Sequence, residues 1–100
     1  MAKGYHLTNK AVDDLSDIWN YTFDQWSESQ ADKYYKSLIT QCEDIAKNPN
    51  IGKNYIEISP SLFGLRYIRH IIFYRILNSN RIEVTRILHE RMDLKRRVLE

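Results

Sequence analysis

The spacing of hydrophobic residues in the first third of the chain predicts a helix. Apolar or small side chains recur there every three or four residues, as they do on one face of an amphipathic helix. Thr8 has the side-chain oxygen that an N-cap needs, so the helix should start just after it and end near Asp24 or Gln25. The predicted buried face consists of Ala11, Leu15, Ile18, Trp19, Thr22 and Trp26.

A second helix is predicted directly after the first. Ser27 followed three positions later by Gln30 has the form of a capping box. The helical pattern then continues to about Lys47, where Asn48-Pro49-Asn50-Ile51-Gly52 should end it because Pro lacks the backbone donor. Two helices joined by so few residues should form an antiparallel hairpin. The expected apolar face consists of Ala31, Tyr34 or Tyr35, Leu38, Cys42, Ile45 and Ala46.

The second half of the chain has the pattern of β-strands. Residues 70–77 and 82–88 are rich in β-branched and aromatic side chains, and the polar residues 78–80 between them suit a hairpin turn. The apolar run from 65 to 77 is too long for one average strand, so we expect a break near Ile68–His70. Residues 5–7 form a further short candidate strand, and residues 55–58 a brief extended or helical piece.

This order of elements predicts one α+β domain over residues 1–100. It comprises an N-terminal strand, an antiparallel αα-hairpin, a three-stranded antiparallel meander and a short C-terminal helix. One face of the sheet should pack on the hairpin, and no element is left to cover the other face. By strand parity, Ile82, Val84 and Leu88 should point at the helices, and Glu83, Thr85, Ile87 and His89 away from them.

Arg86 breaks this alternation, because it falls on the apolar parity of its strand. It must either be buried with a partner, which is costly, or lie at a bulge or strand end that re-aims its side chain. We favour the bulge or strand end, since such irregularities cluster at functional sites.

Charge is distributed unevenly along the chain. Residues 1–50 carry five lysines against eight acids, whereas residues 51–100 carry eight arginines and two lysines against five acids. Arginine is suited to bidentate contact with phosphate or carboxylate. The basic half is therefore either a solvated strand face or a surface that binds a nucleic acid or an acidic partner.

The composition argues against a membrane-spanning protein and against an exported one. No apolar run approaches the roughly 20 residues that a membrane span needs, and the N-terminal residues lack the hydrophobic core of a signal peptide. Cys42 is the only cysteine, so no internal disulfide can form, which fits a reducing cytoplasm. In a helical apolar pattern it is expected to be a small core residue rather than a reactive thiol.

Candidate chemistry is sparse. The three histidines are far apart in sequence, no metal-ligand spacing or phosphate-binding glycine loop is present, and no cofactor is expected. Arg69, His70, Arg86, His89 and Glu90 could converge on the uncovered sheet face. Arginines that hold a phosphate beside a general acid or base could cleave RNA. The alternative, which we place first, is a polar strand face without catalytic activity.

The last ten residues mix apolar and cationic side chains. One interpretation is a capping helix that buries Met92 and Leu94. The other is an exposed amphipathic tail that docks on another protein. The residues that would then contact a target are Arg91, Met92, Leu94, Lys95, Arg96 and Arg97.

Several segments, in order and spacing, resemble the ParE branch of the RelE/ParE toxin superfamily over nearly the whole chain. The strongest are Arg69-His-Ile-Ile-Phe-Tyr-Arg75 and Arg86-Ile-Leu-His-Glu-Arg-Met-Asp93. Others are Tyr5-His-Leu-Thr8 with Asp14-Leu15, Ile18-Trp19 with Tyr21-Thr22, Trp26-Ser27 with Gln30-Ala31, Tyr34-Tyr35, and Asn48-Pro49 with Gly52-Lys53.

The resemblance implies the toxin of a type II toxin–antitoxin pair, with the fold already inferred. ParE toxins inhibit DNA gyrase, and a ParD-like antitoxin wraps a disordered arm around them. RelE relatives instead cleave mRNA on the ribosome. Arg69, Arg86 and His89 would serve that chemistry here, although Glu90 replaces the tyrosine that follows the histidine in some nucleases. We predict a cytoplasmic, non-enzymatic gyrase inhibitor, with the ribonuclease as the alternative and direct nucleic-acid binding as a third.

An acidic or amphipathic arm of the antitoxin is expected to cover the groove of the helical hairpin, and charge complementarity would favour fast association. An edge of the sheet could also accept it by strand addition. The residues expected to contact it are Leu15, Trp19, Tyr35, Leu38, Arg69 and Arg75.

Overall fold

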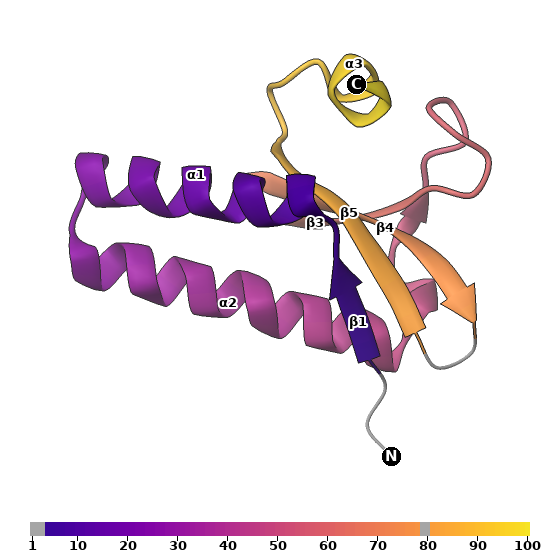
Figure 1. The fold of residues 1–100 in the computed structure, drawn as a ribbon, viewed down its shortest axis with the longest axis horizontal. Coiled ribbons are helices and arrows are strands. Elements are labelled where there is room, and N and C mark those ends of the chain that lie inside the picture. The colour runs from indigo at the N-terminus through magenta and orange to yellow at the C-terminus, as the bar shows by residue number, and fades with distance from the viewer. Residues whose placement is uncertain (1–3, 79–80) are drawn as a thin grey trace.

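The chain folds as an α+β structure with the predicted order of elements (Figure 1). A computed structural model describes residues 4–78 and 81–100. The elements are β1 (Gly4–Leu7), α1 (Asn9–Gln25), α2 (Glu28–Lys47), the 3-10 turn η1 (Pro49–Ile51), β2 (Lys53–Asn54), β3 (Phe63–Tyr67), β4 (His70–Asn78), β5 (Arg81–His89) and α3 (Leu94–Leu99). The predicted fold class is confirmed, and the turn after Asn78 lies outside the described residues.

The five strands form one sheet in the order β1-β5-β4-β3-β2. Strands β3, β4 and β5 pair antiparallel in sequence order, which confirms the predicted meander. Two features were not predicted. β1 joins the sheet by pairing parallel to β5, and the two-residue β2 extends the opposite edge. The segment from residue 55 to 58 forms turns rather than a strand or helix.

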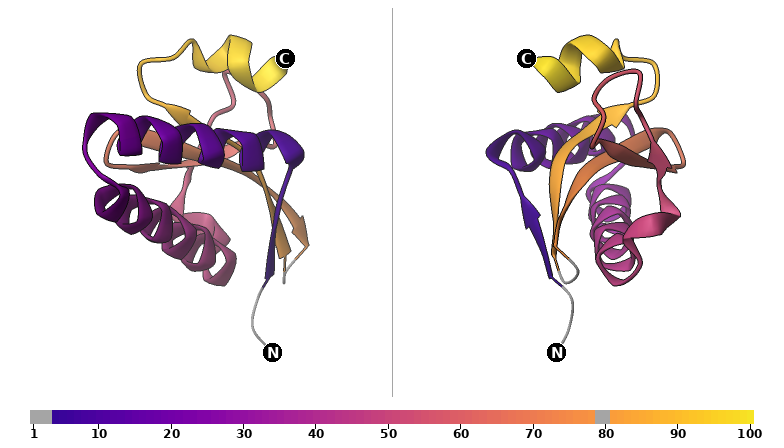
Figure 2. Two further views of the ribbon diagram at one scale, coloured as in Figure 1. Left: turned by 60° about the vertical axis from the view of Figure 1, so that its left-hand side comes forward. Right: turned by 90° about the vertical axis from the view of Figure 1, so that its right-hand side faces the viewer.

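The two long helices start at the predicted capping residues. The Thr8 hydroxyl accepts a hydrogen bond from the Ala11 N–H, and the Ser27 hydroxyl accepts one from the Gln30 N–H. These bonds satisfy donors that a helix N-terminus otherwise leaves unpaired. The helices run antiparallel across one face of the sheet, so the predicted hairpin is confirmed (Figures 1 and 2).

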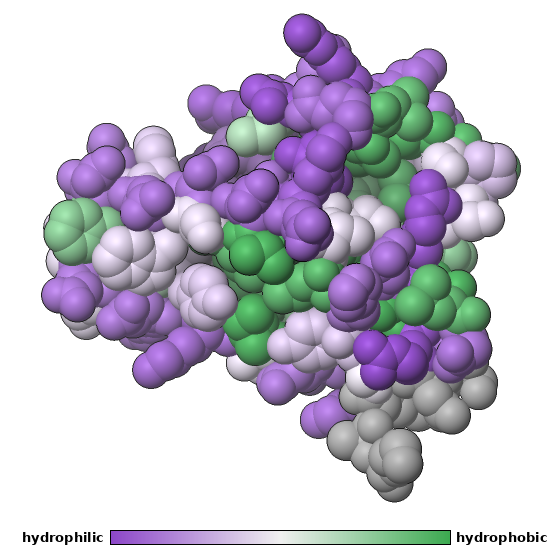
Figure 3. Space-filling model, in the orientation of Figure 1, coloured by the Kyte–Doolittle hydropathy of each residue, from purple (hydrophilic) through white to green (hydrophobic). Residues whose placement is uncertain are grey.

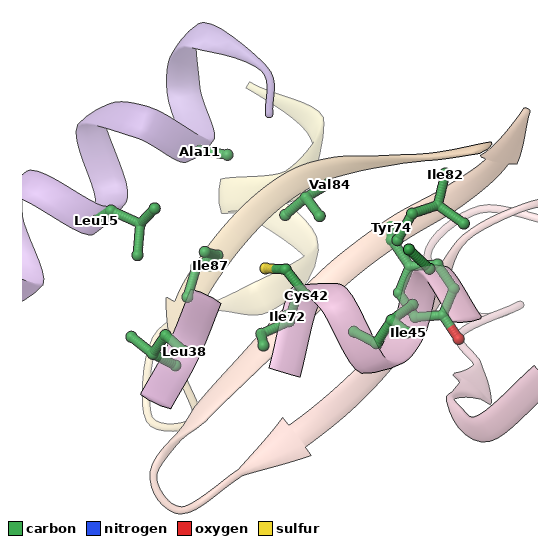
Figure 4. Packing of buried hydrophobic residues seen from close by; sticks show 11 residues of the cluster. Ala11, Leu15, Leu38, Cys42, Ile45, Ile72, Tyr74, Ile82, Val84 and Ile87 are labelled. Carbon is green, nitrogen blue, oxygen red and sulfur yellow. The ribbon is translucent and has the colours of Figure 1, made fainter. Parts of the chain in front are cut away.

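The main core lies between this hairpin and the sheet (Figure 4). Leu38, Cys42 and Ile45 of α2 are fully buried against the sheet, as the helical pattern predicts. The buried residues of this cluster are Ala11, Leu15, Leu38, Cys42, Ile45, Ala46, Ile72, Tyr74, Ile82, Val84 and Ile87. The predicted apolar face of α1 is right at Ala11 and Leu15 but wrong at Trp26, which caps the helix and is 76% exposed.

The chain turns from β3 into β4 at Ile68, within the predicted break. Ile68 has a φ of 56°, the left-handed region that a β-branched residue rarely adopts. Its side chain is exposed. The Glu90 N–H donates to the carbonyl of Arg69, which ties this turn to the end of β5.

A bulge in β5 changes which side chains face the helices. Phe73 of β4 lies opposite Arg86, whereas the next residue, Tyr74, lies opposite Val84, so Thr85 is the extra residue. The bulge puts both Val84 and Ile87 on the helix side, and Leu88 on the other side. The predicted orientations of Ile87 and Leu88 are therefore wrong, because they assumed an unbroken strand.

The second face of the sheet is covered, contrary to the prediction. Its buried residues are Leu62, Ile71, Phe73 and Leu88. Leu94 and Val98 of α3 pack on this cluster from one side, and Tyr55 and Ile58 of the loop between β2 and β3 pack from the other (Figure 2). A loop with little regular structure and a six-residue helix were too short to be recognised as a covering layer from the sequence.

Candidate functional site

The outer side of the helical hairpin carries an apolar patch. Val12 and Phe23 are each 46% exposed and Tyr35 is 38% exposed, while Trp19 and Ile39 are partly buried. Trp19 stacks on Phe23, and its ring N–H donates to the Asp32 carboxylate of α2 over 2.9 Å. Figure 3 shows apolar surface along the seam between the two helices. We call Val12, Trp19, Phe23, Tyr35 and Ile39 the hairpin patch.

Two of the expected antitoxin contacts are not on this surface. Leu15 is 2% exposed and Leu38 is not exposed at all, because both face the sheet. A partner cannot reach them in this conformation, so their predicted role as contacts is wrong. Trp19 lies one helical turn from Leu15, and Tyr35 lies one turn from Leu38. Both have surface that a partner can reach.

Several cations gather at the other end of the molecule. Arg91, Lys95 and Arg96 are exposed, and Met92 beside them is 42% exposed. Asp93 caps α3 by accepting from the Arg96 N–H. Arg97 is exposed too, but its guanidinium lies 3.6 Å from the Glu100 carboxylate.

The short helix α3 is held from below by apolar side chains. Leu94 and Val98 are partly buried against the second cluster. The capping-helix interpretation is therefore right at Leu94 and wrong at Met92, and docking on another protein stays a prediction. Leu94 anchors a capping helix, whereas Met92 and the cations remain at the surface.

Arg86 is engaged in an ion pair inside the protein. Its Nε and Nη2 donate to the two carboxylate oxygens of Asp14 over 2.8 and 3.0 Å, and Nη1 donates to the Arg97 carbonyl over 2.5 Å. The hydrogen bond that Arg86 donates to Asp14 raises the pKa of Arg86, against the effect of burial. Both alternatives for Arg86 therefore occur together, since it follows a bulge and is also buried with a partner. The prediction that favours the bulge or strand end alone is therefore incomplete.

Two histidines meet where β4 and β5 pair. His70 lies opposite His89, with ring centroids 5.3 Å apart. The Tyr34 hydroxyl lies 2.7 Å from His70 Nδ1. Burial, with His89 as the next cause, lowers the pKa of His70 to about 4, and burial raises the pKa of Tyr34 to about 12. Both groups are therefore neutral near pH 7.

The residues proposed for RNA cleavage are only partly assembled. The backbone of Arg69 lies beside Glu90, next to His89, and the Arg69 side chain is exposed. The cavity that Arg86 lines contains neither Arg69 nor His89. Because Asp14 already binds the guanidinium of Arg86, the same N–H groups are not available to bind a phosphate bidentately. The predicted convergence of all five residues is therefore wrong at Arg86.

Other site classes find no support in the residues described. No three His, Cys, Asp or Glu side chains among them are placed to share a metal ion. No helix among them is long and apolar enough to cross a membrane. Arg75, an expected antitoxin contact, instead lines a cavity beside α1 and donates to the Ser59 hydroxyl over 3.3 Å.

The structural role of Asp14 was not predicted from the sequence. The sequence did contain a signal for it. Asp14 lies at the edge of the apolar face of a helix, and Arg86 lies on the apolar parity of a strand. Buried charges of opposite sign are expected to pair. The cavity lined by Lys10 and Glu100 was also missed, since its residues are far apart in the chain.

Comparisons with known proteins agree with this architecture. Residues 5–94 match the family model described as "ParE toxin of type II toxin-antitoxin system, parDE". "Toxin ParE1" of Mycobacterium tuberculosis (strain ATCC 25618 / H37Rv) is 38% identical over 96 residues, covering 96% of this chain and 98% of that protein. "Toxin ParE1" of Caulobacter vibrioides is 32% identical over 93 residues, covering 93% and 95%.

A solved structure shows the same fold. "Chromosomal ParDE TA system from P. aeruginosa" superposes with a TM-score of 0.74 at 19% sequence identity, covering 88% of this chain and 96% of that chain. The family match spans nearly all of the elements that build the sheet and the hairpin. The chain belongs to the ParE toxin family of type II toxin–antitoxin systems.

Proposed function

We propose that this toxin inhibits DNA gyrase by binding to it, without turning over a substrate, and that a ParD-like antitoxin neutralises it. The observation that carries the proposal is the contrast between its two sets of arginines. Arg86, one of the three candidates for RNA cleavage, is occupied by Asp14, whereas Arg91, Lys95 and Arg96 are exposed and make no ion pair within residues 4–78 and 81–100. Free surface cations suit docking on a macromolecule more than they suit catalysis.

The docking surface on gyrase is proposed to be acidic. Arg91, Lys95 and Arg96 are exposed beside Met92. A partner would therefore contact positive charges next to one apolar side chain. Complementary charge speeds association and selects the partner, while a buried apolar side chain contributes most of the affinity. Because gyrase acts on DNA within the cell, the proposal places this protein in the cytoplasm.

The antitoxin is proposed to bind the hairpin patch. An amphipathic segment can place its apolar side chains in a groove between two helices. The solved relative is titled as a ParDE system, which supports an antitoxin partner for this chain too. Trp19 and Tyr35 would act as aromatic anchors, and Arg69 remains available for an acidic side chain.

The test is a DNA supercoiling assay with purified gyrase and antitoxin-free toxin. We expect the toxin to inhibit supercoiling and the co-expressed antitoxin to restore it. A folded toxin that leaves supercoiling and gyrase-mediated DNA cleavage unchanged at saturating concentration would refute the gyrase proposal.

The ribonuclease alternative rests on the cluster of Tyr34, His70 and His89. It predicts codon-phased cuts in ribosome-bound mRNA, detected by primer extension. His89→Ala should then abolish the cuts, whereas it should leave gyrase inhibition intact under our proposal. Because His70 is neutral and Arg86 is paired, we place this alternative second.

A further inference from the structure

A cavity of about 410 Å³ opens between the first turn of α1 and the end of α3. Three cationic side chains line it, namely Lys10 from α1, Arg75 from β4 and Arg86 from β5. They come from three elements that only the folded sheet brings together.

The charges around the cavity favour an anion. Asp14 balances Arg86, but Arg75 makes no ion pair in residues 4–78 or 81–100, although Glu83 lies opposite it on β5. The 17-residue helix α1 also begins here, so its positive end faces the same space. The nearby hydroxyls are used elsewhere, since Thr8 donates to the Thr85 carbonyl and Thr85 to the Phe73 carbonyl.

The cavity already holds an anion that belongs to the chain itself. The side-chain carboxylate of Glu100 lies 3.5 Å from Arg86 Nη1, and Lys10 donates to the main-chain oxygen of Glu100. This carboxylate is 45% exposed, and its contacts with Arg86 and Arg97 are 3.5 and 3.6 Å long. Strong charge-assisted hydrogen bonds are shorter than about 3 Å, so the side-chain carboxylate of Glu100 is a weakly held occupant.

We propose that this cavity is a binding site for a carboxylate, which takes an acidic side chain from a partner segment in place of Glu100. Arg75 is the cation free to pair with the incoming group, and Lys10 becomes available when Glu100 leaves. Leu94 anchors α3 on the second cluster, so Glu100 can move while the helix stays docked. Glu100 then competes with the partner and sets the affinity of the site.

The probe is a capped tetraglutamate peptide titrated into the full chain at constant ionic strength, with backbone amide shifts as the readout. Glu100→Gln removes the internal competitor and should tighten peptide binding several-fold, with shifts centred on the first turn of α1 and on β4 near Arg75. Arg75→Gln should weaken binding in the parent and in Glu100→Gln. Lys33→Gln, on the exposed side of α2, is the matched charge control and should change nothing.

Inorganic phosphate serves as the second probe, since it would report a general anion site. Tighter binding of the peptide than of phosphate supports the carboxylate assignment, and equal or tighter phosphate binding overturns it. Shifts that spread over α3 rather than the cavity, or an unchanged affinity in a folded Glu100→Gln, overturn the site itself. The outcome is independent of gyrase, because the titration contains only the chain and the probe.

Discussion

The carboxylate of Asp14 in α1 holds the guanidinium of Arg86 in β5 at both of its oxygens and also accepts the main-chain N–H of Ile87, over 2.9 Å. These bonds fix α1 against the strand just after the Thr85 bulge. The side chains of Arg86 and Asp14 are 9% and 11% exposed. Removing one partner would leave a charge buried without compensation.

We therefore predict that Asp14→Ala lowers the free energy of unfolding by about 3–5 kcal/mol. The double variant Asp14→Leu with Arg86→Met should recover part of this loss, because no unpaired charge remains. Its residual cost comes from the unpaired Ile87 N–H, about 1–3 kcal/mol. Urea unfolding of the parent and the two variants measures these values. A loss below about 1 kcal/mol in Asp14→Ala would show that the pair contributes little.

His70 should make stability depend on pH. Its folded-state pKa is lowered to about 4 from an ordinary value of 6.5. The unfolded chain therefore binds the proton more readily, so stability is full above pH 6.5 and falls as the pH drops toward 4. Allowing for the partial exposure of His70, we expect a loss of roughly 2 kcal/mol.

Urea unfolding at about pH 7 and about pH 5 checks this dependence. His70→Gln is the control, because it removes the titrating ring and should flatten the profile between these two values. An NMR titration that gives a pKa near 6.5 for the His70 ring in the folded protein would contradict the assignment of this pH dependence to His70.

The thiol of Cys42 should be inert in the folded protein. It has no exposed surface, and burial raises its pKa to about 12. Because only the thiolate attacks a disulfide reagent, Ellman's reagent at about pH 8 should react at the rate of global or local unfolding. Addition of urea should restore the rate of a free thiol. Fast modification of the folded chain would place Cys42 outside the core.

The hairpin patch should carry antitoxin affinity. Trp19→Ala combined with Tyr35→Ala removes both aromatic anchors without touching the core, and we expect affinity to fall by about tenfold or more. Isothermal titration with the antitoxin measures the change. Tyr21→Ala is the matched control, because Tyr21 is 66% exposed but lies on the opposite side of α1. An equal loss of affinity in the double variant and in Tyr21→Ala would show that the antitoxin does not bind through the hairpin patch.

The sequence predicted the elements best where a local signal was strong. Thr8 and Ser27 marked the starts of both helices because their hydroxyls cap the nearest turn. The break at Ile68 followed from strand length alone. The partner of β1 could not be predicted, because parallel pairing with β5 joins residues about 77 positions apart without a local signal.

The candidate sites show the same limit. Trp19 was predicted both on the buried face of its helix and as a partner contact, and the structure leaves it partly buried, whereas Met92 and Lys95 are exposed. Leu15 and Leu38 were assigned to the surface although their helical phase pointed to the core. The bulge at Thr85 was anticipated near Arg86, but its effect on Ile87 and Leu88 was not, since one inserted residue reverses every later side chain.

The most direct test compares gyrase inhibition by two charge-reversed variants. Lys95→Glu with Arg96→Glu reverses the exposed face of α3, and Lys33→Glu with Lys36→Glu makes an equal change on the exposed side of α2. Both should keep the fold and the affinity for the antitoxin. Our account predicts that supercoiling inhibition is lost in the α3 variant and retained in the α2 variant. Full inhibition by the α3 variant, or equal loss in both, would contradict it.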